Sequence, residues 1–223
     1  TVRALDGEVQ FNELISKLET SKFRLSIGGS FVSKYQAQPT GASLELPENV
    51  AGWSGRAQLN YEGISLLAEY ARKMNDPNKS NHYIYRPGQG LFASATYSQK
   101  GFGINLSAKT IDNMEFRSDR EAGFNDLFIN YLPALTRQHT YNLAATLYPY
   151  ATQPNGEIGF QSDISYKIKK GSKVGGKYGT TIMLNASWIN SLKRSYISDA
   201  NGDTATALLE DFVYLNEDPG REG

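Results

Sequence analysis

Residues 23–34 read FRLSIGGSFVSK and alternate between two kinds of side chain. Leu25, Ile27 and Phe31 fall on one face of an extended chain, and Arg24 falls on the other. Side chains of a β-strand point alternately to opposite faces of the sheet. The stretch therefore predicts a strand over residues 23–35 with one apolar and one strongly polar face.

The same two-residue period recurs along most of the chain. Further strands are predicted over residues 53–61, 64–72, 91–98, 102–110, 139–148, 157–167 and 180–190. Glu62-Gly63 and Lys100-Gly101 have the X-Gly composition of tight hairpin turns. Weaker strand patterns lie near residues 127–132 and 212–215. These segments predict an all-β, antiparallel protein.

Most of these strands have about nine to eleven residues, which is close to the length that a tilted strand needs to cross a bilayer. Tyr and Trp residues lie near the ends of the apolar faces, as in the interfacial girdles of membrane barrels. The early connections alternate between long and short, another feature of outer-membrane barrels. We therefore expect a transmembrane β-barrel. The alternative is a soluble or surface-attached β-sandwich that binds glycan through its aromatic residues.

The barrel hypothesis assigns each alternating residue to lipid or to the lumen. The predicted lipid-facing residues are Leu25, Ile27, Phe31, Leu59, Leu106, Leu143, Phe160, Ile164, Leu184 and Trp188. The predicted lumen-facing residues are Arg24, Arg56, Gln58, Glu69, Asn105, Lys109, Gln161 and Asp163. So much polarity on one face indicates an interior that holds water or a polar plug.

Several short motifs carry a resemblance that covers nearly the whole chain. They are LPENV at 46–50, LAEYA at 67–71, YIYR at 83–86, DNM at 112–114 with FRS at 116–118, YPYATQP at 148–154 and GGKYG at 175–179. On these the chain resembles an uncharacterised family of Bacteroidota outer-membrane β-barrel proteins, a domain of unknown function. The resemblance implies an outer-membrane location and a larger barrel, of which this chain is a middle portion. It implies no catalytic residue.

The domain prediction follows from both arguments. Residues 1–223 are expected to form part of a single barrel domain, with about eight or nine strands visible. Val9, Phe11, Leu14, Ile15 and Leu18 indicate a short amphipathic helix, so residues 1–22 are predicted to be a short helix or an irregular lead-in. The first and last residues suggest a fragment of a longer chain.

Composition argues against several functions. The chain has no cysteine, which excludes disulfides and thiolate chemistry, and its 23 basic residues balance 23 acidic ones, so nucleic acid is not an expected partner. The two histidines, His82 and His139, have no recognisable nucleophile beside them on the same face, so no enzyme is predicted. The expected partners are outer-membrane lipid and other envelope proteins.

No cofactor is predicted with one weak exception. Asp199, Asn201, Asp203 and Glu210 place oxygen ligands at the spacing of a calcium-binding EF-hand loop. Thr204 occupies the position where that loop needs glycine, so an ordinary turn is the favoured interpretation.

Two charged segments allow more than one interpretation. The acidic and basic residues between Asp112 and Glu121 could fold into the barrel as a plug, although a solvated external loop is favoured. Five lysines between Lys167 and Lys177 could meet the anionic headgroups of lipopolysaccharide or form a soluble basic loop. The function expected from all of these features is a passive, porin-like channel or a structural component of an envelope complex.

Overall fold

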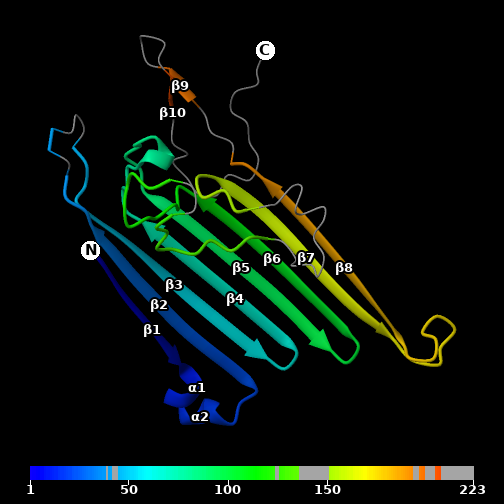
Figure 1. Cartoon of the computed structure of the whole chain (residues 1–223). Helices are drawn as coiled ribbons and strands as arrows, with labels where there is room; N and C mark the ends of the chain where they lie inside the picture. The colour runs from blue at the N-terminus through cyan, green and yellow to red at the C-terminus, as the bar shows by residue number, and fades with distance from the viewer. Residues whose placement is uncertain are drawn as a thin grey trace.

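The computed structural model describes residues 1–38, 40–41, 45–123, 126–135, 151–192, 196–198 and 204–206, the last two segments as backbone only. The main feature is an antiparallel sheet of eight strands in sequence order (Figure 1). Its strands are β1 (Val2–Gln10), β2 (Phe23–Tyr35), β3 (Asn49–Tyr61), β4 (Ile64–Lys73), β5 (Gly88–Gln99), β6 (Phe102–Asp112), β7 (Glu157–Ile168) and β8 (Thr180–Asn190). Two short strands, β9 (Tyr196–Ser198) and β10 (Thr204–Thr206), form a separate pair.

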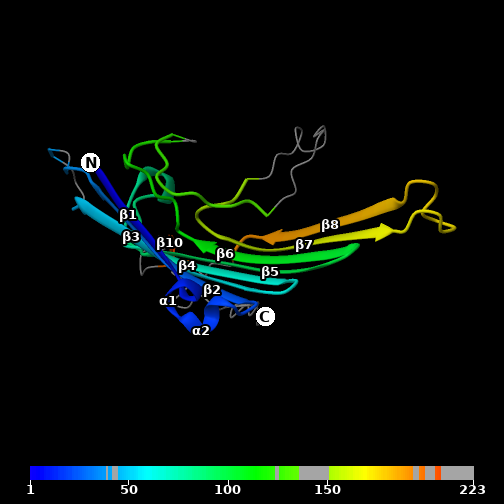
Figure 2. The ribbon, with the colours of Figure 1, turned by 90° about the horizontal axis from the view of Figure 1, so that it is seen from below.

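The sheet is open. β1 pairs with β2 and β8 pairs with β7, and in the described part of the chain the outer edges of β1 and β8 have no strand partner. The structure therefore confirms the all-β, antiparallel architecture and does not confirm a closed barrel. The sheet is nevertheless curved, and Figure 2 shows loops that follow β4 and β6 on the inner side of the curve.

Seven of the eight strands coincide with predicted segments, and the first does not. The range expected to be a short helix or irregular lead-in contains the full strand β1, followed by the helical turns α1 (Phe11–Leu14) and α2 (Ser16–Glu19). The Asn12 side chain fixes these turns to β2, since it donates to the carbonyl of Phe23 at 2.6 Å and accepts from the amide of Leu25 at 3.0 Å. Near residues 127–132 there is a single bridge, Arg117 to Phe128, in place of a strand. The segments predicted at 139–148 and 212–215 lie outside the described residues.

The hydrophobic core lies at one end of the sheet, under the loops. Val50, Ile111, Met114, Phe116 and Leu135 are each less than 9% exposed. Strand positions beneath the loops are small: a Cβ built at Gly52 would lie 3.7 Å from the Phe116 ring, and one at Gly90 would lie 3.6 Å from Met114. Long connections follow β2, β4 and β6 at this end, whereas the turns at 62–63 and 100–101 lie at the other. We call these the long-loop end and the short-turn end.

Candidate functional site

The two faces of the sheet carry different side chains across its full width. Pairing in register aligns Arg24 with Asn105 and Asp163 through the intervening strands, Gln58 with Gln161, and Arg56 with Glu69 and Lys109. All eight residues predicted to face a lumen therefore share one face, which we call the polar face. The described residues predicted to face lipid share the opposite side. The same registers align Leu25 with Leu59 and Leu106, and Ile27 with Phe160 and Trp188. They also pair Ile164 with Leu184 and Phe31 with Trp53 on that side. This opposite side is the apolar face. Leu143 lies outside the described residues.

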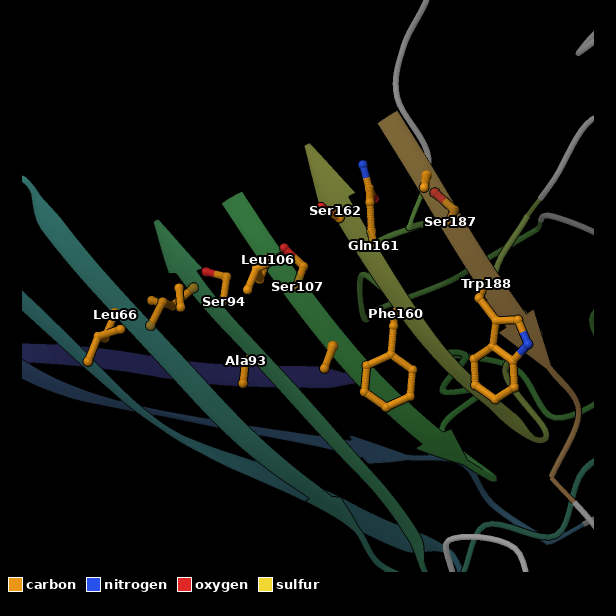
Figure 3. A pocket seen from close by; sticks show the side chains of 14 residues that line it. Leu66, Ala93, Ser94, Leu106, Ser107, Phe160, Gln161, Ser162, Ser187 and Trp188 are labelled. Atoms are coloured by element: carbon orange, nitrogen blue, oxygen red, sulfur yellow. The ribbon is translucent and has the colours of Figure 1, made fainter. Parts of the chain in front are cut away.

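The apolar face is exposed. Leu184 is 59% exposed, Leu106 49%, Trp188 48% and Phe160 44%. A shallow groove of about 680 Å³ crosses this face, with alanines such as Ala93 and Ala108 between bulky side chains, and no charged residue lines it. Figure 3 shows Phe160 and Trp188 pointing to one side of the sheet and Gln161 and Ser187 to the other. An exposed apolar patch of this extent is typical of a membrane or protein interface.

Aromatic residues of the apolar face follow two oblique lines. The first line starts toward the long-loop end, where Phe31 pairs with Trp53. Tyr70 lies two residues closer to the short-turn end than this pair, and the pair Phe160 and Trp188 lies two residues closer again. Trp53 packs on Tyr70, and Phe160 on Trp188, with 5.7 Å between ring centroids in both pairs. Tyr61, Tyr97, Phe102 and Tyr166 lie toward the short-turn end. A belt that crosses the strands obliquely is expected where strands tilt relative to a membrane plane.

The polar face is covered at the long-loop end by the chain itself. The covering residues are 74–87, 113–123, 126–135 and 151–156, which we call the loop layer. Strand residues Lys34, Lys73, Lys109 and Glu157 point into it, and none is more than 2% exposed. Buried charges need compensating partners. Their partners therefore show how the loop layer is held.

One ionic cluster attaches the loop after β4. The Lys34 ammonium lies 2.7 Å from one oxygen of Asp76, as an ion pair without the alignment of a hydrogen bond, and the Lys73 ammonium lies 3.7 Å from the other. Lys73 also donates to the backbone carbonyl of Glu115. The cluster thus joins β2, β4 and two segments of the loop layer.

A second buried ion pair attaches the segments that precede β7. Lys109 on β6 lies 2.8 Å from Glu157 on β7. Its ammonium also donates to the Pro133 carbonyl and the Thr152 hydroxyl, both at 2.6 Å. Glu157 in turn accepts from the amide of Gln153 at 2.9 Å. One strand-borne pair therefore holds segments on both sides of residues 136–150.

The loops are also bonded to each other. Arg86 pairs with Asp112 through both carboxylate oxygens. Asn113 donates to the Arg86 carbonyl at 2.8 Å and accepts from Asn81 at 3.0 Å. Gly88 allows the backbone of Asn113 to lie close to the start of β5, because a Cβ at Gly88 would lie 2.0 Å from the Asn113 carbonyl oxygen.

The charged segment 112–121 is largely buried, so its interpretation as a solvated external loop is wrong. Arg117 pairs with Glu115 and lies 3.9 Å from the Phe128 ring centroid. Arg120 donates to the carbonyls of Gln36 and Pro47, both at 3.1 Å. These bonds leave the two guanidinium groups in the interior of the loop layer, where backbone carbonyls and Glu115 replace water.

The rim of the loop layer is more exposed. Asp119 accepts from the backbone amide of Glu121 and the side chain of Gln36, both at 2.9 Å. These hydrogen bonds hold the pKa of the Asp119 carboxyl below its usual range. Tyr83 donates to Glu121 at 2.6 Å, and this bond raises the pKa of the Tyr83 phenol.

Beyond the loop layer, the polar face presents side chains from the strands alone. Asp163 accepts from Gln161 at 2.9 Å and from Asn185 at 2.6 Å, and Thr96 donates to Asn105 at 2.9 Å. These partly exposed amides and hydroxyls form a polar lattice across β5 to β8. The polar face therefore combines a covered end with buried ion pairs and an open end, which on β5 to β8 is lined mostly by amides and hydroxyls.

Arg56 links three strands on the polar face. It bonds Asp6 on β1 at 2.7 Å and Glu8 at 3.2 Å, and so reaches across β2. Gly28 of β2 lies beneath it, where a Cβ would approach the guanidinium within 2.7 Å. The contact of Arg56 with β1 thus depends on a missing side chain in the strand between them.

Sequence reasoning assigned no anchoring role to the residues that hold the loop layer, which are Lys34, Lys73, Asp76, Arg86 and Glu157, although strand alternation puts Lys34 and Glu157 with the lumen-side residues. One signal was available, since three of them are charged residues at strand ends, with polar-face parity, next to a long loop. The candidate calcium ligands Asp199, Asn201, Asp203 and Glu210, and His139, lie outside the described residues. Among the residues that are described, no group of three His, Asp or Glu side chains is arranged to hold a metal.

A model of a protein family matches residues 1–216. The chain belongs to DUF6029, a family of unknown function. Searches of curated proteins and of solved structures found no match. The DUF6029 match assigns no activity, and the two faces of the sheet are the features that bear on function. No helix in the described ranges is both long and apolar enough to span a membrane.

Proposed function

We propose that the chain forms part of the wall of an outer-membrane β-barrel, with the apolar face toward lipid and the polar face toward the lumen. The observation that carries this proposal is the combination of an exposed apolar face and a polar face covered by the protein's own loops. A β-sandwich would bury its apolar face against a second sheet. The resemblance of the sequence to Bacteroidota outer-membrane barrels supports the same placement.

The loop layer determines which passive role is better supported. Its charged side chains bond to the sheet and to neighbouring loops, so few are left free to dock another protein. Loops packed on the inner side of the curve occupy space that a lumen would otherwise leave to water. We therefore favour a channel narrowed by a plug at its long-loop end over a scaffold that presents long free loops. The proposed role involves no catalysis.

Electrical recording on the assembled barrel that contains this chain tests this function. Reconstitution in a planar bilayer should give stable ohmic conductance, because the polar lattice and Arg56 leave a hydrated path along the open part of the polar face. Charge reversal at Glu69, which is partly exposed on that face, should change the ratio of cation to anion permeability. The matched control is Glu62→Lys in the turn after β3, which should leave selectivity unchanged.

Two outcomes would contradict the proposal. A chain that remains in the aqueous phase and binds oligosaccharide would support the β-sandwich alternative. A sealed barrel without conductance that co-purifies with other envelope proteins would support a scaffold.

A further inference from the structure

The connection between β7 and β8 is a basic hairpin loop, residues 169–179. With its flanking residues it carries Lys167, Lys169, Lys170, Lys173 and Lys177, all exposed. No Asp or Glu occurs between Asp163 and Asp199. The chain as a whole has no net charge, so this excess of positive charge is local.

Internal hydrogen bonds give the hairpin loop a defined shape. Gly171 donates its amide to the Gly176 carbonyl at 2.7 Å, and the Ser172 hydroxyl donates to the Lys169 carbonyl at 2.8 Å. Gly175 packs so closely that a Cβ there would lie 2.0 Å from the Lys169 carbonyl oxygen. The lysines are therefore displayed on a folded support.

Two large side chains project from the same loop. Val174 is 72% exposed and Tyr178 is 83% exposed, and the Lys177 ammonium lies 5.5 Å from the Tyr178 ring centroid. The apolar face extends to the base of the loop, where Tyr166 pairs with Ile182 and both are more than half exposed. Cationic side chains beside protruding apolar and aromatic ones are typical of segments that bind at a membrane interface.

We propose that hairpin loop 169–179 binds the headgroups of anionic phospholipids. The loop lies at the short-turn end, and in outer-membrane barrels the short turns face the periplasm. That side of the outer membrane presents phospholipid, whereas lipopolysaccharide lies on the side of the long loops. The inference rests on the proposed membrane-spanning role of the apolar face, and it adds a specific lipid class and one end of the sheet.

The test compares a loop variant with a charge-matched control. The loop variant carries Lys170→Gln and Lys173→Gln, and the control carries Arg24→Gln and Lys79→Gln, two exposed cationic residues that lie on the polar face and in the loop layer. Both are added as full chains to vesicles of phosphatidylcholine alone or with phosphatidylglycerol, and the bound fraction is measured by flotation. Resistance of the bound chain to urea extraction reports insertion separately.

A lysine near an anionic surface strengthens binding by about fivefold, so the loop variant should bind phosphatidylglycerol vesicles roughly 25-fold more weakly than the unmodified chain. The control should lose far less, and added salt should remove the difference. Equal losses of binding in both variants would overturn the inference. A loss of binding to lipopolysaccharide vesicles without a loss of binding to phosphatidylglycerol vesicles would overturn it as well. Failure of the unmodified chain to insert into either vesicle would instead count against the proposed function.

Discussion

The two faces of the sheet differ in what covers them. At the long-loop end of the polar face, the loop layer buries Lys73, Lys109 and Glu157 almost completely. On the apolar face, Leu106, Phe160 and Trp188 keep nearly half of their surface exposed. In a sheet that folds in water, burial of the apolar face drives folding, so loops or a second layer are expected there. Here the loops cover the polar face and the apolar face is left exposed. This arrangement is expected where lipid surrounds the apolar face and the polar face encloses water.

The largest effect is expected from breaking the buried ion pair beneath the loop layer. Lys109→Met leaves Glu157 charged, buried and without its ammonium partner, which should lower the free energy of unfolding by about 3–5 kcal/mol. Urea unfolding of the lipid-embedded chain measures the change.

A double variant separates charge from packing. Lys109→Met with Glu157→Leu removes both charges and should recover most of the lost stability, because an apolar pair of similar size replaces an ion pair with little loss. The decisive comparison is the urea concentration at the midpoint of unfolding. If the single variant has the same midpoint as the double variant and the unmodified chain, the loop layer is not held through this pair.

The apolar face should tolerate charge less well than the polar face beside it. Leu59→Arg and Phe160→Arg should each cost about 2–4 kcal/mol of membrane folding free energy if the sites lie at mid-membrane. The matched controls are Gln58→Arg and Gln161→Arg, one residue away and on the polar face. Folding yield into liposomes measures both sets, and normal folding of the two apolar-face variants would refute the lipid assignment.

A smaller effect is expected at β1. Gly28→Ala puts a methyl group where the Arg56 guanidinium lies, so Arg56 must release Asp6 and Glu8. Because Asp6 is largely exposed, solvent screens this ion pair and the loss of stability should be small, seen as faster hydrogen exchange in β1 with the rest of the sheet unchanged. Gly55→Ala is the control, because a Cβ there meets nothing within 4 Å. Equal exchange in both variants would show that Arg56 does not hold β1.

The alternation of polar and apolar residues predicted most strands of the sheet, because the two faces of a strand follow directly from this local pattern. β2 and β8 match their predicted bounds, since the alternation there is uninterrupted. β1 was missed because Arg3 and Gly7 occupy two of the positions that should be apolar on its outer face, which leaves Leu5 and Val9 as a weak signal. The spacing of apolar residues from Val9 onward is helical and masked this weak strand signal, although the helical turns begin only after Gln10.

The loop layer was not predictable in the same way. Charge within segment 112–121 suggested solvent, and the partners that neutralise it lie far away in sequence, as Arg120 does from Gln36 and Arg86 does from Asp112. Burial of a charge depends on those partners, and a single sequence does not reveal long-range pairs. Membership of the polar and apolar faces, in contrast, follows from strand period alone, and register then aligns each set across the sheet.

Cysteine accessibility distinguishes a face that meets lipid from a face that meets water. Single cysteines at Gln58, Asn105 and Gln161 should react with a small, membrane-impermeant thiol reagent in the lipid-embedded chain. Cysteines at the neighbouring positions Leu59, Leu106 and Phe160 should be protected in lipid and should react after unfolding. Equal labelling of the two sets in lipid would show that the two faces do not meet different surroundings.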